Sequence, residues 1–240
     1  MKLPELNKKR IIFMLLFFVL VLIANKINFS ALVGAEKQYL TFFQFFGPLA
    51  GSFLGVIYGV LTVLFSQLAD FFIVGKEWNW LNILRLLPML FAAYYFGSKK
   101  KIVSAVVPLV CMGLFILHPV GRVAWVYSLF WLIPVLAQIL PEKVPGKLFF
   151  RSFGATFTAH AIGTIIWIYT IPITAEQWIA LIPITAMERF AFGTGIAVSY
   201  VLLNSLLDYV VEKWKISLPS LTLFLEEKYT LRKLLRLEKG

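Results

Sequence analysis

The sequence predicts an all-α integral membrane protein, a polytopic helix bundle of six to eight transmembrane helices with one short or re-entrant segment. Hydrophobic residues make up 60% of the chain and charged residues only 15%, whereas a soluble domain carries roughly a quarter charged residues. The mean hydropathy is +0.84. Apolar runs long enough for a membrane helix recur from Ile11 to Val211, which leaves little room for a soluble module.

The breaks between the apolar runs give eight candidate spans. In order they cover residues 11–26, 40–48, 49–74, 83–98, 102–119, 122–141, 152–171 and 188–211. The second is too short for a full crossing, since the hydrocarbon core needs about 20 helical residues. Residues 1–211 are thus predicted to form one transmembrane domain. The tail, 212–240, mixes leucines with basic residues and is expected to be a basic amphipathic helix on the inner membrane surface, or a cap on a cytoplasmic partner.

Basic residues predict the orientation, because lysine and arginine accumulate on the cytoplasmic side. Seventeen of the 23 lie before residue 11, at 99–101, at 143–151 or after residue 212. This asymmetry predicts a multi-pass protein of the cell membrane with both termini in the cytoplasm. It also requires the stretch 40–74 to enter and return, and Gly47-Pro48 is the expected place for that turn.

Small residues recur at intervals of four in three segments, which aligns them along one helix face. In lipid such faces allow close helix packing, either within the chain or against another membrane subunit. The predicted packing residues are Gly47, Gly51, Gly55, Gly59, Ala155, Ala159 and Gly163, and a third series is Ala191, Gly195 and Ser199.

Charged residues inside a span usually mark a site or a pathway. Asp70, Arg85, Glu188 and Arg189 are all expected near the outer ends of their spans, with Glu188 and Arg189 opening the last one. They could neutralise each other in pairs, such as Asp70 with Arg85, or line an outward-facing cavity. The neighbouring loops add tryptophans and amides that suit flat ring compounds. The candidate substrate-binding residues are Trp78, Asn79, Arg85, His160, Glu176, Trp178, Glu188 and Arg189.

His160 is expected about 13 Å deep in its span, bonded to a neighbouring backbone group, to a ligand or in a proton relay. Neither it nor His118 has a partner at metal-ligand spacing, and no phosphate-binding or hydrolase motif appears. We therefore expect no metal, no cofactor and no ATPase or other enzymatic activity. An intramembrane enzyme with His160 and Glu188 as acid and base is the weaker alternative. The basic residues punctuate apolar runs and form no aromatic-interleaved face, which argues against nucleic-acid binding.

Two stretches resemble the substrate-binding S components of energy-coupling-factor (ECF) transporters. The run TFFQFFGPLAGSFLGVIYGVL is similar to the family's early region, where a short aromatic segment precedes a glycine-rich turn and a helix. The stretch from Phe153 to Asn204 is similar to its final two helices and the loop between them. The chain departs from the family in its helix count, which is usually six there, and in lacking small residues at four-residue intervals in 11–24. The start MKLPEL lacks the histidine motif of the metal-ion branch.

The resemblance implies a small membrane protein that binds a vitamin-like micronutrient at its outer side. It further implies delivery of this small-molecule solute through a transmembrane coupling subunit and two cytoplasmic ATPases. The sequence thus predicts a membrane-embedded binding component for solute uptake. The alternative from another class is a non-transporting membrane subunit or scaffold, whose small-residue faces pack partner helices and whose charges merely pair.

Overall fold

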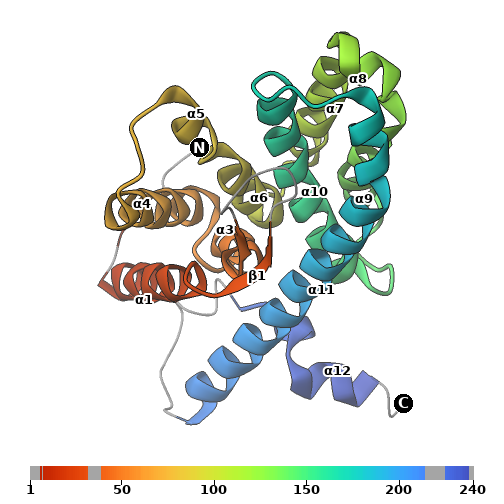
Figure 1. Ribbon diagram of the computed structural model, residues 1–240. Coiled ribbons are helices and arrows are strands. Elements are labelled where there is room, and N and C mark those ends of the chain that lie inside the picture. The colour runs from red at the N-terminus through yellow and green to blue at the C-terminus, as the bar shows by residue number, and fades with distance from the viewer. Residues whose placement is uncertain (1–5, 7, 32–38, 214–224, 238–240) are drawn as a thin grey trace.

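The computed structural model describes residues 6, 8–31, 39–213 and 225–237, which are mostly helical (Figure 1). The first elements are α1 (Lys8–Ala24), β1 (Asn28–Ala31), β2 (Tyr39–Thr41), α2 (Phe43–Phe46), the 3₁₀ helix η1 (Gly47–Leu49), α3 (Ala50–Phe53), α4 (Val56–Val74), α5 (Trp80–Leu84) and α6 (Leu87–Gly97). Then follow α7 (Lys101–Leu117), α8 (Pro119–Val123), the 3₁₀ helix η2 (Trp125–Trp131), α9 (Leu132–Ile139), α10 (Lys147–Ile168), α11 (Ala175–Lys213), the 3₁₀ turn η3 (Glu227–Tyr229) and α12 (Leu231–Leu237). The all-α class is confirmed, with one short antiparallel β1–β2 pair added.

Helices α1 and α4 run in the same direction. Near their starts, the Arg10 guanidinium lies 5.1 Å from the centre of the Tyr58 ring. Near their ends, Lys26 Nζ donates to Asp70 Oδ1 over 3.1 Å. The chain between them must therefore return along the bundle, and α2, η1 and α3 form that return. We call the two ends of the bundle the Asp70 end and the Arg151 end, after the charged residue that each carries.

The reversal before α4 lies at Gly55, and the prediction of a turn at Gly47-Pro48 is wrong. Gly47 and Pro48 continue the returning segment as a 3₁₀ helix. Gly55 has φ 80° and ψ 156°. Glycine adopts this conformation readily, whereas a residue with a Cβ is sterically strained in it. Proline at the start of a 3₁₀ turn needs no such reversal, because its fixed φ suits a helical first turn.

The predicted straight glycine groove is therefore divided among elements. A Cβ on Gly51 would lie 1.8 Å from the Ala93 carbonyl oxygen of α6, and one on Gly59 would lie 2.4 Å from the Ala50 oxygen of α3. Gly47 lies against Met89 of α6. Three of the four glycines thus allow close approach of α3, α4 and α6, and the fourth forms the turn.

Contacts along the second half fix the remaining directions. Gln67 of α4 donates to the Leu86 carbonyl at the start of α6, so α6 starts near the Asp70 end. On α10, Gly154 lies against Tyr95 near the end of α6, whereas Gly163 lies nearest Pro88 at its start, so α6 and α10 are antiparallel. Helix α7 runs parallel to α10, since Tyr169 after α10 donates to the Leu114 carbonyl late in α7.

The segment 119–139 brings the chain back to the Arg151 end in three pieces, α8, η2 and α9. Lys147 Nζ, at the start of α10, donates to the Ala137 and Leu140 carbonyls at the close of this segment (2.8 and 2.6 Å). These last-turn carbonyls have no partner within their own helix, so a lysine ammonium satisfies them. The lysine itself is buried.

Helix α11 is a single 39-residue helix, about 58 Å long at 1.5 Å per residue. The prediction that a loop separates the spans 152–171 and 188–211 is wrong over most of its length, because the helix already begins at Ala175. Thr174 and Gln177 form a reciprocal capping box, in which the Thr174 N–H donates to Gln177 Oε1 and the Gln177 N–H to Thr174 Oγ1 (2.8 and 3.3 Å). This motif starts a helix well before Glu188, which consequently lies mid-helix.

The described part of the tail folds back on the Arg151 end. Residues 225–230 contain only a 3₁₀ turn, and α12 is seven residues long, so the predicted amphipathic helix is not continuous there. Its earlier part, 214–224, lies outside the described residues. Arg232 of α12 donates to Glu212 of α11, which holds α12 beside the end of α11, as Figure 1 shows.

Two apolar clusters form the core. One joins α1, α2, η1, α3, α4 and α6 with the parts of α10 and α11 nearer the Arg151 end. The other joins α7, α8, η2 and the parts of α10 and α11 nearer the Asp70 end. Figure 1 shows α1, α3 and α4 on one side and α7 to α9 on the other, with α6 and α10 between them and α11 running diagonally from the side of α8 and α9 to the lower left. Within the described ranges, α4 and α11 are long and apolar enough to cross a membrane.

Candidate functional site

A cavity of about 260 Å³ lies between α10 and α11, in the half of the bundle nearer the Asp70 end. Residues from α2, α6, η2, α10 and α11 line it, together with Arg85 just before α6. Its lining includes five of the eight candidate binding residues, Arg85, His160, Trp178, Glu188 and Arg189. The additional lining side chains with polar atoms are Gln44, Tyr127, Thr164, Trp167 and Thr185.

Arg189 is the most buried charge of this cavity, with only 6% of its surface exposed. It lies about 21 Å along α11 from the helix start at 1.5 Å per residue. Its terminal nitrogens reach Glu188 Oε2 at 3.5 Å and Thr156 Oγ1 of α10 at 3.4 Å. Its guanidinium carbon stands 4.6 Å from the centre of the Phe192 ring. Burying a charge is costly unless it is paired and hydrogen-bonded, and neither polar contact is short.

A chain of side-chain hydrogen bonds fixes the state of His160. Trp131 Nε1 donates to His160 Nδ1 over 3.2 Å. An indole nitrogen can only donate, so Nδ1 accepts and the neutral imidazole carries its proton on Nε2. That proton is directed at the Tyr127 hydroxyl, 2.9 Å away, and the same hydroxyl is hydrogen-bonded to the Thr185 hydroxyl, also at 2.9 Å. The partners of His160 are thus side chains, where the sequence suggested a neighbouring backbone group as one option.

Three buried N–H groups of the lining residues have no hydrogen-bond partner among the described residues. They are Nε1 of Trp178, Nε of Arg85 and Nε of Arg189. Trp178 is only 3% exposed, and its ring is packed edge-on against Phe115 and Tyr127 at 5.6 and 5.0 Å between ring centres. Unpaired buried donors cost about 1–3 kcal/mol each. All three groups are donors, so the cavity favours a molecule that supplies acceptors.

Trp78, Asn79 and Glu176 do not line this cavity. Trp78 is 62% exposed and packs on the rings of Phe71 and Phe72. Asn79 caps α5, since its Oδ1 accepts from the Asn82 N–H over 2.8 Å.

Glu176 lies in the exposed first turn of α11. Hydrogen bonds from its own backbone N–H and from the Thr174 side chain lower its pKa, because they favour the carboxylate. An acidic residue at this position is explained by the helix dipole.

The predicted Asp70–Arg85 pair does not form. Asp70 instead accepts from Lys26 and Lys76, both at 3.1 Å, while Arg85 donates to Asn82 Oδ1 over 3.2 Å. As a result, the positive charge of Arg85 is not neutralised by Asp70 and remains beside the cavity.

Tyr127 and Thr185 are the site residues that the sequence analysis missed. Tyr127 lies in η2, inside an apparently uniform apolar run, and Thr185 follows Pro183 in what was expected to be a loop. A signal for Thr185 was present, because the capping box at Thr174 extends the helix through it. In the described parts of the chain, no group of three or more His, Cys, Asp or Glu side chains comes together as a metal site.

Comparison with known proteins gives one informative match. The chain is similar to an uncharacterized protein, MJ0923, of Methanocaldococcus jannaschii, with 32% identity over 155 residues. The match covers 58% of this chain and 52% of the archaeal protein, so the chain spans about half the length of that curated relative. No family model matches the chain, and no solved structure matches it.

Proposed function

We propose that this chain is a membrane-embedded binding component that takes up a small organic solute and has no ATPase of its own. The observation that carries the proposal is the cavity between α10 and α11, where a buried arginine and a buried tryptophan present unpartnered donors. Buried polar groups without partners are rare in folded proteins and call for an explanation. A bound acceptor group would explain these.

The charges narrow the class of solute. Arg85 and Arg189 bring two positive charges to the cavity and Glu188 one negative charge, which favours a solute carrying one negative charge. A carboxylate fits best, because its two oxygens can accept from two guanidinium or indole N–H groups at once. Trp167, Trp178 and Tyr127 supply aromatic surface for a flat ring. The volume of about 260 Å³ lies just below the range of drug-sized pockets, roughly 300–1,000 Å³.

The direction of the elements supports a membrane setting with both termini on one side, since the chain passes eight times between the two ends of the bundle. The successive passes are α1, the segment α2–η1–α3, α4, α6, α7, the segment α8–η2–α9, α10 and α11. Two of these passes are broken, and irregular backbone at membrane depth is tolerated only where protein or a water-filled cavity covers it. The run from Gly47 to Gly51 meets that condition, since every residue in it is buried.

The Arg151 end would face the cytoplasm, because it carries the clusters at 99–101 and 143–151. The cavity then lies toward the outer side, as uptake requires. The likeness to ECF S components adds the proposal of a transmembrane coupling subunit and cytoplasmic ATPases as partners. A scaffold without a ligand is the second candidate, favoured by the close glycine contacts of α3, α4 and α6.

Native mass spectrometry of the protein purified from its membrane tests the proposal. A retained small organic anion is expected, and its affinity can then be measured for two matched variants. Trp178→Phe keeps an aromatic six-membered ring and removes the unpartnered N–H with the five-membered part of the indole, so binding should weaken at least about tenfold, the loss of one hydrogen bond to a charged group. Trp78→Phe makes the same change outside the cavity and should bind normally. Equal affinity of both variants, or no retained molecule, would favour the scaffold.

A further inference from the structure

A second cavity, of about 650 Å³, lies at the Arg151 end of the bundle. Residues of α3, α6, α9 and α10, the first residue of α7, the loops after α6 and α9, and the returning tail line it. Its charged lining residues are Lys99, Lys101, Glu142, Lys147, Arg151, Glu226 and Lys228. Five cations thus face two carboxylates, and the cavity carries a net charge of +3. It shares no lining residue with the cavity between α10 and α11.

Arg151 forms the centre of this cavity. Its guanidinium carbon lies 4.3 Å from the centre of the Phe96 ring and 4.8 Å from that of Tyr200, so aromatic faces hold it in place. One terminal nitrogen donates to Glu226 Oε1 over 2.8 Å. The other two nitrogens, Nε and NH2, are buried and have no hydrogen-bond partner among the described residues. A fixed guanidinium with two unused adjacent donors is suited to a bidentate oxyanion.

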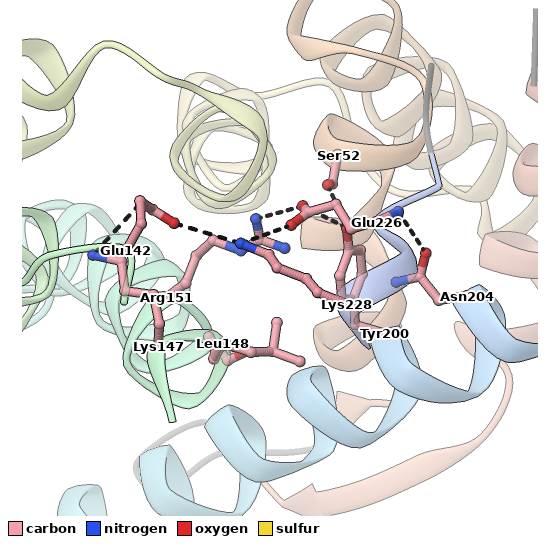
Figure 2. A network of polar contacts seen from close by, with 10 residues as sticks. Ser52, Glu142, Lys147, Leu148, Arg151, Tyr200, Asn204, Glu226 and Lys228 are labelled. Atoms are coloured by element: carbon pink, nitrogen blue, oxygen red, sulfur yellow. Dashed lines mark hydrogen bonds and ion pairs between the residues drawn. The ribbon is translucent and has the colours of Figure 1, made fainter. Parts of the chain in front are cut away.

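The lysines divide into two kinds. Lys147 is already bonded to two carbonyls, and Lys228 lies 3.6–3.7 Å from carboxylate oxygens of Glu226 and Glu142. Figure 2 shows Lys147 of α10 beside Glu142, and Lys228 of the tail between Glu142 and Glu226. Lys99 and Lys101, in contrast, are exposed, and no contact of their ammonium groups competes with a ligand in the described structure. They are the cations available to a ligand in addition to Arg151.

We propose that this cavity is a binding site for a phosphate group, held by Arg151 and by Lys99 and Lys101. The phosphate could belong to the headgroup of an anionic lipid or to a soluble phosphate compound. Basic pockets between helices on the cytoplasmic side are suited to lipid headgroups, and only this source depends on the proposed membrane setting. The site is separate from the solute cavity and does not require that cavity to bind anything.

The tail supplies a competitor to the phosphate. The Glu226 carboxylate accepts hydrogen bonds from Arg151 and from the Tyr200 hydroxyl (2.8 and 2.7 Å). The Glu226 backbone N–H donates to Asn204 Oδ1 (3.2 Å). These contacts fix the carboxylate beside the proposed phosphate (Figure 2). It occupies one guanidinium N–H and lowers the positive charge of the cavity. Neutralising it should therefore strengthen phosphate binding.

Thermal unfolding of the full chain in a neutral detergent tests the site. The midpoint is measured with inorganic phosphate against sodium chloride of equal ionic strength, and with phosphatidylglycerol against phosphatidylcholine. A ligand that binds only the folded state raises the midpoint. Lys99→Gln with Lys101→Gln should weaken phosphate binding tenfold or more, through loss of two charged donors. The matched control is Lys100→Gln with Lys143→Gln, which removes the same charge from exposed positions outside the cavity.

The outcomes separate the possibilities. If both ligands raise the midpoint of the control variant (Lys100→Gln with Lys143→Gln) but not that of the variant at the cavity (Lys99→Gln with Lys101→Gln), the site is a phosphate site open to soluble compounds. If only phosphatidylglycerol raises the midpoint, the site binds the lipid headgroup. Glu226→Gln should increase the shift in either case. The proposal is overturned if neither ligand shifts the midpoint, or if both double variants reduce the shift equally, since the effect would then reflect net charge. A failed result here leaves the retained-molecule test of the solute cavity unaffected.

Discussion

Replacing Gly51 by alanine tests the packing of the returning segment against α6. The new Cβ would lie 1.8 Å from the Ala93 carbonyl oxygen, 2.8 Å from its carbon and 3.2 Å from the Gly97 nitrogen. All three atoms belong to the backbone, so no side chain can rotate away to relieve the contact. Ordinary contacts need roughly 3.5 Å, and α3 and α6 must therefore separate by more than about 1 Å. Overpacking a core costs about 1–3 kcal/mol, and we expect a value near 3 kcal/mol for this rigid contact.

Chemical unfolding of the purified protein in detergent measures this cost. Gly97→Ala should give a similar loss, because its Cβ would lie 2.1 Å from the Gly51 carbonyl oxygen. Gly113→Ala is the matched control, since a Cβ there meets nothing within 4 Å, and a glycine in a helix is less stable than alanine by up to about 1 kcal/mol. The reasoning is refuted if Gly51→Ala unfolds with the same free energy as Gly113→Ala.

Three further predictions follow from single contacts. Burial alone would raise the pKa of Glu226, but Arg151 lowers it. The ion pair should therefore stabilise the docked tail fully above the ordinary glutamate pKa of about 4.3, and this stabilisation should be lost as the pH falls through the lowered pKa. Proteolysis of the tail at graded pH checks this, and Glu226→Gln should abolish the pH dependence. Thr174→Ala should destabilise the start of α11 by about 0.5–2 kcal/mol, seen as faster amide exchange over its first turns but not its last. Trp131→Phe should lower the free energy of unfolding by about 1–3 kcal/mol, because it leaves His160 Nδ1 without a hydrogen-bond donor. An unchanged free energy of unfolding would contradict the assigned hydrogen-bond chain.

The helical class could be predicted from composition, because a chain so poor in charge leaves its backbone groups to be satisfied within helices. The helix boundaries at 8–24, 101–117 and 147–168 lie within about five residues of the predicted spans, and a lysine is the first residue of each helix. The breaks within 40–53 and 119–139 could not be predicted in this way. Hydrophobicity is the same in a 3₁₀ and an α segment, so a hydropathy pattern does not distinguish them.

The candidate site was predicted in part for a similar reason. Arg85, Glu188 and Arg189 stand out because charge is scarce, and the structure brings all three to one cavity. Their partners depend on which helices are neighbours, which the sequence does not contain. Trp78 and Trp178 look equivalent in the sequence, yet one lies on the surface and the other is buried, because α11 begins at Thr174 and carries Trp178 into the bundle.

Two of the passes along the bundle are short or broken, the second (α2, η1 and α3) and the sixth (α8, η2 and α9). Gln44 of the second pass and Tyr127 of the sixth both line the cavity. Transporters commonly build their binding sites from such discontinuous helices. The Gly47-Pro48 pair, wrong as the place of a turn, lies in the 3₁₀ helix of the second pass, close in sequence to Gln44.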